Sequence, residues 1–186
     1  DVVKVVGGYT SGLMAVGTHL IDLLHQLFGD VEWVIALKED VVGIDSLWYS
    51  ENYHPNDPPV SGILGFKTGI IGQVYASCRT NYPFFELEIF AREGRITIQE
   101  WSTSYLIETH KLESIDNRKE LRLQNRITSR ANNLMMSAIQ DIITSLEQGK
   151  PTLSPGEDGL RVMRTIEGLE KSCHNQGKVI KLGDDS

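Results

Sequence analysis

Residues 12–28 read GLMAVGTHLIDLLHQLF, and this stretch decides the fold expected for the chain. Its large apolar residues recur at spacings of three and four, which places them along one side of a helix. Such a stripe needs a surface to cover, and the flanking sequence supplies strands. The pattern therefore predicts a helix over residues 13–28 that packs on a sheet and ends at Gly29. Thr10 or Ser11 is expected to cap its first turn.

Strand-like segments surround this helix. Residues 1–6 are rich in valine, and the glycines of residues 7–12 are expected to form a flexible turn between this strand and the helix. Gly69 and Gly94 lie in short connections that indicate antiparallel hairpins. A loop whose aromatic side chains could reach a ligand is expected over residues 45–59. Further strands are expected over residues 31–37, 60–66, 70–78, 84–91, 95–100 and 105–110.

The last part of the chain is expected to be mostly helical. Residues 111–130 are strongly polar and are expected to be exposed, without an assigned element. Helices are predicted over residues 132–148 and 155–175, and a short strand over residues 178–182. The order of elements predicts an α+β fold, in which helices cover one face of an open, predominantly antiparallel β-sheet. One domain is expected to span residues 1–186.

The composition argues against several classes of protein. The chain has 18 Lys and Arg residues against 25 Asp and Glu, for a formal net charge of -7. It has no basic run with interleaved aromatics, so no nucleic-acid partner is expected. It has no apolar stretch of about 20 residues, so no membrane association is expected. Cys78 and Cys173 lack CxxC spacing, which favours reduced thiols in a cytoplasmic protein.

His19 is the leading candidate for chemistry, because an imidazole exchanges protons near neutral pH. Asp22 follows three residues later and lies on the same face of the predicted helix. Asp22 could orient His19, or it could accept hydrogen bonds from a neighbouring loop, and the spacing permits both roles. His25 lies about 240° around the helix from His19. The two imidazoles therefore cannot bind one metal ion, and no metal site is expected.

The segment that contains these residues resembles the GxHxxD segment of the Gfo/Idh/MocA oxidoreductases, which Gly17, His19 and Asp22 match. The resemblance extends in the right order over nearly all of the chain. Five later segments are similar to parts of the family that include a glycine hairpin, the last helix and the closing strand: residues 90–98, 146–151, 158–160, 167–172 and 177–179.

The resemblance implies a division of labour between two domains. In the family, an N-terminal Rossmann domain supplies the glycine-rich loop for NAD(P) and the lysine of a Glu-Lys-Pro motif. A C-terminal α/β domain binds the substrate and mediates subunit pairing. This sequence resembles only the C-terminal domain, because it has no GxGxxG and its one Lys-Pro pair, Lys150 and Pro151, follows Gly149 at a helix end. NAD or NADP is therefore expected in the intact parent protein, and none is expected to bind this domain alone.

The reaction that the resemblance implies is hydride transfer at a carbinol or carbonyl carbon of a sugar, polyol or nucleotide-linked sugar. The chain is expected to be inactive without its Rossmann domain. The resemblance gives His19 a catalytic role at the substrate's hydroxyl proton, with Asp22 in support. Tyr9 and Thr18 are close enough in sequence to bind the substrate. Tyr9 could equally pack under the sheet, and Thr18 could bond back to its own helix.

One position departs from the family pattern. The residue four places before His19 is commonly an aspartate or another polar residue, and here it is Ala15. The departure favours an alternative hypothesis, a non-catalytic dimerisation or binding module that kept the scaffold. An independent hydrolase is not expected, because no serine or cysteine nucleophile has a recognisable motif. Apolar residues on the uncovered face of the sheet predict a homo-oligomer that forms through the sheet.

Overall fold

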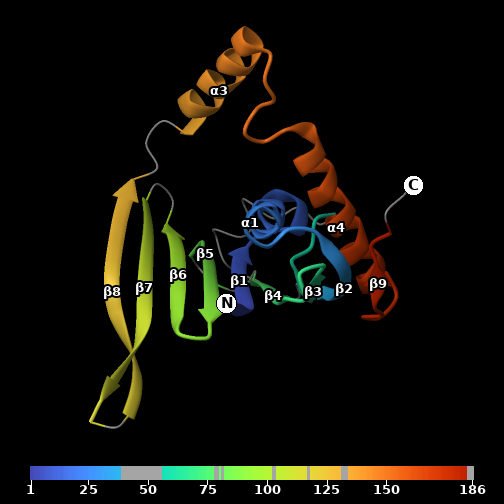
Figure 1. Cartoon of the computed structure of the whole chain (residues 1–186). Coiled ribbons are helices and arrows are strands. Elements are labelled where there is room, and N and C mark those ends of the chain that lie inside the picture. The colour runs from blue at the N-terminus through green and yellow to red at the C-terminus, as the bar shows by residue number, and fades with distance from the viewer. Residues whose placement is uncertain are drawn as a thin grey trace.

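The described strands pair into one sheet, and the helices lie above it (Figure 1). The computed structural model describes residues 1–38, 56–77, 80, 82–101, 104–116, 118–130 and 134–183. Most of the loop expected over residues 45–59 lies outside the described residues, and so does Cys78.

The sheet has the strand order β8-β7-β6-β5-β1-β4-β3-β2-β9. The pairing of β1 with β4 is parallel, and the other neighbouring strands are antiparallel. The predicted predominantly antiparallel sheet is therefore confirmed. Its strands are β1 (Val2–Thr10), β2 (Val31–Lys38), β3 (Val60–Phe66), β4 (Ile71–Ser77), β5 (Phe85–Ala91), β6 (Gly94–Trp101), β7 (Ser104–Ile115), β8 (Arg118–Arg130) and β9 (Ile180–Lys181).

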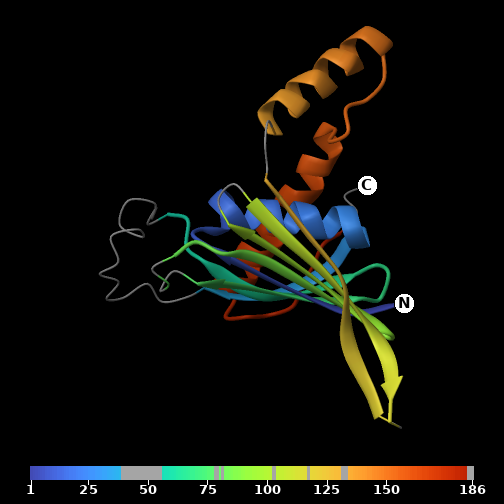
Figure 2. The same ribbon diagram turned by 90° about the vertical axis from the view of Figure 1, so that its left-hand side faces the viewer.

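Two helices pack against one face of this sheet, as Figure 2 shows for α1 and α4. The other face carries no helix among the described residues, so the predicted one-sided arrangement is confirmed. In the described ranges, no helix combines the length and the apolar content needed to cross a membrane. The helices are η1 (Leu13–Gly17), which is a single π-helical segment continuous with α1 (Thr18–Phe28), and then α3 (Leu134–Gln148) and α4 (Gly156–His174).

Strand β1 runs through Gly7 and Gly8, where the sequence had predicted a flexible turn, so that prediction was wrong. The glycines serve close packing on both faces of the strand. A Cβ at Gly7 would lie 2.8 Å from Leu20 of α1, and a Cβ at Gly8 would collide with the ring of Tyr75 on the opposite face. Successive strand residues point to opposite faces, so the pair brings the helix close on one side and Tyr75 close on the other.

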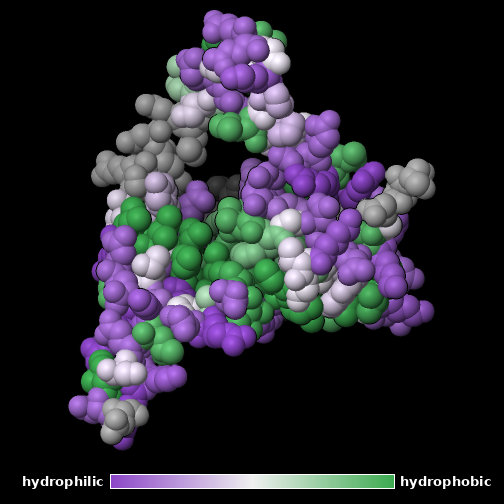
Figure 3. Space-filling model, in the orientation of Figure 1, coloured by the Kyte–Doolittle hydropathy of each residue, from purple (hydrophilic) through white to green (hydrophobic). Residues whose placement is uncertain are grey.

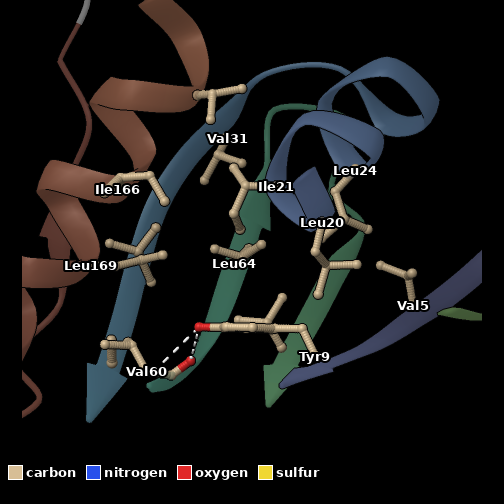
Figure 4. Packing of buried hydrophobic residues seen from close by; sticks show 14 of the residues in the cluster. Val5, Tyr9, Leu20, Ile21, Leu24, Val31, Val60, Leu64, Ile166 and Leu169 are labelled. Atoms are coloured by element: carbon tan, nitrogen blue, oxygen red, sulfur yellow. Dashed lines mark hydrogen bonds between the residues drawn. The ribbon is translucent and has the colours of Figure 1, made fainter. Parts of the chain in front are cut away.

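The hydrophobic core lies between α1, α4 and the half of the sheet that runs from β5 to β2. Figure 4 shows Leu20, Ile21 and Leu24 of α1 above β3 and β1, with Leu169 of α4 beside β2. These side chains are almost wholly buried, and each contributes about 1.5–3 kcal/mol of burial free energy. None of the core residues comes from β6, β7, β8 or α3. We call β1–β5, β9, η1, α1 and α4 the packed half, and β6–β8 with α3 the wing.

The wing corrects the expectation for residues 111–130, to which no element was assigned from the sequence. These residues complete β7 and form all of β8, which pair along their whole length. Their predicted exposure is confirmed, because the described side chains of β8 are exposed. The helix predicted over residues 132–148 is also confirmed as α3 (Leu134–Gln148).

Candidate functional site

The start of the first helix is held by a residue far away in the sequence. The carboxylate of Asp57, just before β3, accepts hydrogen bonds from the backbone N–H groups of Met14 (2.7 Å) and Ala15 (2.9 Å). No side-chain cap comes from Thr10 or Ser11, so the predicted cap was wrong. A carboxylate here satisfies two amides without helical partners and opposes the positive end of the helix dipole.

Gly12 makes this contact possible. A Cβ at Gly12 would collide with both the carboxylate and the backbone oxygen of Asp57. The N–H of Leu13 also donates to the carbonyl of Pro58, at 3.2 Å. The segment before β3 therefore fixes the position of η1, and through η1 the first turn of α1.

Tyr9 supports the same turn from below. Its side chain is only 1% exposed, and its hydroxyl donates to the carbonyl of Val60 (2.8 Å) and accepts from the N–H of Val60 (3.3 Å). A Cβ at Gly17 would lie 3.0 Å from the ring of Tyr9, so the ring packs directly beneath the helix start. The structure thus shows the core-packing alternative for Tyr9, which leaves it no surface on which to bind a substrate.

Thr18 also takes the structural alternative weighed from the sequence. Its hydroxyl donates to the carbonyl of Met14, one turn back, at 2.9 Å. The side chain is half-buried, so part of it remains at the surface beside His19.

His19 itself is exposed in the first turn of α1, and Ala15 one turn before it is exposed too. Asp22 is half-buried one turn later, and no hydrogen bond or ion pair among the described residues joins it to His19. The helix therefore presents an imidazole to the outside from a turn whose backbone is fixed by Asp57 and Tyr9. Such an arrangement can exchange a proton or a hydrogen bond with a group placed against this side of α1.

His25 points elsewhere, as the helical geometry predicted. It is buried against α4, with its Nε2 2.9 Å from the hydroxyl of Thr165. Burial lowers the pKa of His25 below its usual value, and the nearby positive charge of Arg161 lowers it further. His25 is thus a neutral structural histidine between two helices. In the described part of the chain, no group of three His, Cys, Asp or Glu side chains is placed to bind a metal ion.

A charged cluster next to His25 joins α1 to α4. Arg161 forms ion pairs with Asp158 and with Asp30, and Lys67 lies 3.6 Å from Asp30. These partners hold the pKa of Asp158 below its usual range, first through the hydrogen bond from Gln26 and then through Arg161. A cavity of about 140 Å³ opens beside them. Since the cations and carboxylates neutralise one another, this cluster is explained as a structural connection.

Another cavity lies on the opposite face of the sheet, and sequence reasoning missed it. It has a volume of about 290 Å³, and its lining includes Tyr75, whose hydroxyl donates to Glu86. Burial, and then the bond to Glu86, raise the pKa of Tyr75 well above its usual value, so the phenol stays protonated. The lining residues are Tyr75, Ser77, Thr80, Tyr82, Phe84 and Glu86.

The register explains why Tyr75 and Glu86 meet. Gly8 of β1 is paired with Tyr75 of β4 on one side and with Glu86 of β5 on the other, so the two side chains meet over a residue that has none. The Gly7-Gly8 pair is the one feature of the sequence that hints at this contact, and it does not indicate which side chains pack against it. This cavity lies on the face away from α1, so it does not include His19.

Comparison with known proteins identifies relatives of this domain. The model of an oxidoreductase family, described as its C-terminal alpha/beta domain, matches residues 7–182. No curated protein sequence matches the chain.

Several solved structures share the fold. A levoglucosan dehydrogenase in complex with NADH and levoglucosan has a TM-score of 0.74 and 15% identity, over 98% of this chain and 59% of its own. A protein from Desulfitobacterium hafniense that is described as an NADPH-dependent oxidoreductase has a TM-score of 0.75 and 12% identity, over 98% of this chain and 57% of its own. An oxidoreductase from Agrobacterium radiobacter, in complex with NAD+, L-tartaric acid and magnesium, has a TM-score of 0.68 and 17% identity, over 98% and 57%. The chain therefore spans less than two thirds of the length of these proteins.

Proposed function

This chain belongs to the Gfo/Idh/MocA oxidoreductase family as its C-terminal α/β domain, and from this premise we propose that it is the substrate-binding part of an NAD(P)-dependent enzyme. The proposed substrate is a sugar, a polyol or a nucleotide-linked sugar, oxidised or reduced at a carbinol or carbonyl carbon. The observation that carries the proposal is the exposed His19, which stands on a helix start fixed by Asp57.

The proposed role of His19 concerns the proton on the substrate oxygen. When a carbinol is oxidised by hydride loss, its hydroxyl proton must leave, and when a carbonyl is reduced a proton must arrive. An imidazole hydrogen-bonded to that oxygen can accept or donate the proton, or hold the oxygen while another group does so. We propose Asp22 as a supporting residue and the exposed part of Thr18 as a substrate contact. Tyr9 acts as a positioning residue beneath the turn.

The dinucleotide is not assigned to this chain. The Gly7-Gly8 pair lies in strand β1, shortly before the first helix. The side chain of Leu20 packs on one face of the strand at this pair, and that of Tyr75 packs on the other. There is thus no open backbone at this point to receive a pyrophosphate. We propose that a separate N-terminal Rossmann domain of the parent protein binds NAD or NADP, and that this domain alone does not.

Ala15 supports a second candidate function, a binding or dimerisation module without catalysis. The exposed Ala15 offers no carboxylate beside His19. The Asp57 carboxylate reaches the same turn, but its two oxygens accept the amides of Met14 and Ala15. The non-catalytic proposal therefore differs from the first in one prediction: replacing His19 changes no reaction rate of the parent protein.

The test uses the intact parent protein and follows NAD(P)H absorbance with a panel of sugars, polyols and nucleotide-linked sugars. The variant His19→Asn is expected to lower kcat by about 100-fold or more. The matched variant His174→Asn changes an exposed histidine on α4 and is expected to leave the rate unchanged. Equal rates for wild type and His19→Asn would support the non-catalytic module.

We also propose that the open face of the sheet pairs with a second copy of the chain. Large apolar side chains remain exposed there on β3 and β4, among them Ile63 and Ile71. Sedimentation at micromolar concentration tests this, and a monomer would contradict it.

A further inference from the structure

The cavity beside Tyr75 lies on the open face of the sheet, away from His19 on α1. Its volume of about 290 Å³ is close to the lower end of the range of roughly 300–1,000 Å³ in which proteins bind small molecules. The size therefore suits a compact ligand of few atoms. We call it the Tyr75 cavity, and its lining residues are Tyr75, Ser77, Thr80, Tyr82, Phe84 and Glu86.

Three aromatic side chains line the Tyr75 cavity. The rings of Tyr75 and Phe84 are stacked, with centroids 6.0 Å apart and planes inclined by 29°. A Cβ at Gly8 would collide with the ring of Tyr75, so this ring lies directly against strand β1. The ring of Tyr82 is 62% exposed. The face of an aromatic ring carries partial negative charge, so it attracts cations as well as apolar groups.

Glu86 adds a full negative charge to these aromatic walls. Its carboxylate is half-buried and accepts a hydrogen bond from the hydroxyl of Tyr75. It forms no ion pair with a described residue, and the lining residues include no Lys, Arg or His. Tyr75 does not share the charge, because burial and the contact with Glu86 raise the pKa of its phenol well above the usual value. The negative charge therefore stays on Glu86 and lacks a cation.

The Tyr75 cavity is poorly suited to an anion. The hydroxyl of Tyr75 already donates to Glu86, and that of Thr80 donates to the carbonyl of Tyr82 at 2.8 Å. The chain carries a formal net charge of -7, and hydrophilic residues cover much of the surface drawn in Figure 3. A net negative charge attracts cations and repels anions. The local and the overall charge thus favour a cationic ligand.

We propose that the Tyr75 cavity binds a small organic cation, a primary or quaternary ammonium compound, between its aromatic rings and the carboxylate of Glu86. The rings contact the carbon atoms around the cationic nitrogen, and the carboxylate balances its charge. A metal ion requires several such ligands, and Glu86 is the one carboxylate in the lining. The proposed ligand is not the substrate of the reaction at His19, because the two sites lie on opposite faces of the sheet.

Calorimetric titration of the intact parent protein with choline tests the proposal. The matched control ligand is dimethylbutanol, in which a carbon atom replaces the charged nitrogen of choline. Both ligands have the same shape, and choline alone gains from the ring faces and from the charge of Glu86. Choline is therefore expected to bind at least about tenfold more tightly than dimethylbutanol.

Three variants locate the binding. Glu86→Gln keeps an acceptor for the Tyr75 hydroxyl but removes the charge, and it is expected to weaken choline binding by about tenfold or more. Tyr82→Ala removes an exposed ring, which spares the fold, and is expected to weaken it by about threefold or more. Glu100→Gln removes an exposed carboxylate outside the lining and is expected to leave the affinity unchanged. Circular dichroism checks that each variant is folded.

Equal affinities for choline and dimethylbutanol would overturn the proposal, because charge would then have no part in the binding. An affinity for choline that both Glu86→Gln and Tyr82→Ala leave unchanged would also overturn it, since choline would bind elsewhere. The absence of binding at about 10 mM choline would have the same meaning.

A cationic side chain offers the same chemistry as a free ligand, and two further measurements distinguish these sources. Arg79 lies outside the described residues. Binding of choline by an Arg79→Gln parent but not by the wild type would assign the cation to this chain. Self-association that Glu86→Gln weakens and choline inhibits, measured by sedimentation, would assign it to a second copy on the open face. Either result would overturn the proposal of a free ligand.

Discussion

The packed half and the wing belong to the same sheet but differ in how far their side chains are buried. In the packed half, α1 and α4 bury one face of the strands, and the core residues are concentrated there. In the wing, β7 and β8 are longer than any strand of the packed half, yet their side chains remain half-buried or exposed. Backbone pairing and exposed side-chain contacts hold the wing strands together, while side-chain burial stabilises the packed half. The domain thus has one part with a hydrophobic core between helices and sheet, and one part whose strands have little side-chain cover.

The largest contrast is expected from truncation of a leucine in each region. Leu20 is fully buried between α1 and β1, so Leu20→Ala is expected to reduce the free energy of unfolding by about 2–5 kcal/mol. Leu146 of α3 is 80% exposed, so Leu146→Ala is expected to change it by less than about 0.5 kcal/mol. Urea denaturation followed by circular dichroism measures both. Comparable losses would show that α3 is packed within the isolated chain.

Alanine at two strand glycines gives a smaller contrast. A Cβ at Gly62 would lie 2.6 Å from the carbonyl oxygen of Ile35, and a Cβ at Gly94 would lie 2.6 Å from that of His110. At Gly62 the side chain of Leu169 stands 3.1 Å away on the helix side, so the strand cannot shift. Gly62→Ala is expected to cost about 1–3 kcal/mol.

Gly94→Ala is expected to cost less than about 1 kcal/mol, because the wing strands have no helix above them and can move apart. Thermal unfolding of the two variants makes the comparison. A larger cost at Gly94 would mean that the wing is as rigid as the packed half.

The His25 contact predicts a pH dependence that belongs to the packed half. Because the pKa of His25 is lowered on folding, the unfolded chain binds more protons just below pH 6.5 than the folded chain. Stability is therefore expected to fall as the pH drops from 7 to 5, since Arg161 adds to the burial cost while Asp30 and Asp22 offset part of it.

His25→Gln should reduce the change of the unfolding midpoint between pH 7 and pH 5. His174→Gln, at an exposed position, should leave this pH dependence unchanged. Asp158 affects the stability of the fold in a different pH range. Its lowered pKa contributes stability above its ordinary value near 3.8, and this is lost only at more acidic pH. A midpoint of the wild type that stays constant between pH 7 and 5 would contradict the role given to His25.

Local signals predicted much of the packed half. The three-and-four spacing of residues 13–28 predicted one helix over the range that η1 and α1 occupy, although not the π-helical form of η1. The glycines at Gly69 and Gly94 predicted the hairpins β3–β4 and β5–β6. The β8 strand was missed because its polar side chains show no apolar alternation, and its strand structure comes from pairing with β7. The spacing of apolar residues therefore predicts helices and strands that bury an apolar face, and it does not predict a strand whose side chains are exposed.

The candidate site shows the same limit over longer distances. The place of His19 on the first helix follows from the sequence pattern, but its exposure and the carboxylate of Asp57 that fixes the helix start, more than forty residues away, come from the structure. Tyr75 and Glu86 meet only because both pair with Gly8, a register that no single strand specifies. The residue types at the site were visible in the sequence, whereas their partners depended on the tertiary fold.

The smallest effect is expected from the ion pair between Glu108 of β7 and Arg126 of β8, which face each other across the wing at 2.6 Å. Arg126 is well exposed and its charge is screened by water, so a double-mutant cycle with Glu108→Gln and Arg126→Gln should give a coupling of at most about 1 kcal/mol. Raising the NaCl concentration to about 1 M shortens the Debye length to about 3 Å and should reduce this coupling further. The Arg161 cluster of the packed half joins two helices and two carboxylates, so its coupling should be larger and less sensitive to salt. If the wing pair proved as strong and as insensitive to salt as the Arg161 cluster, side-chain contacts would stabilise the wing, and the contrast between backbone pairing and core burial would fail.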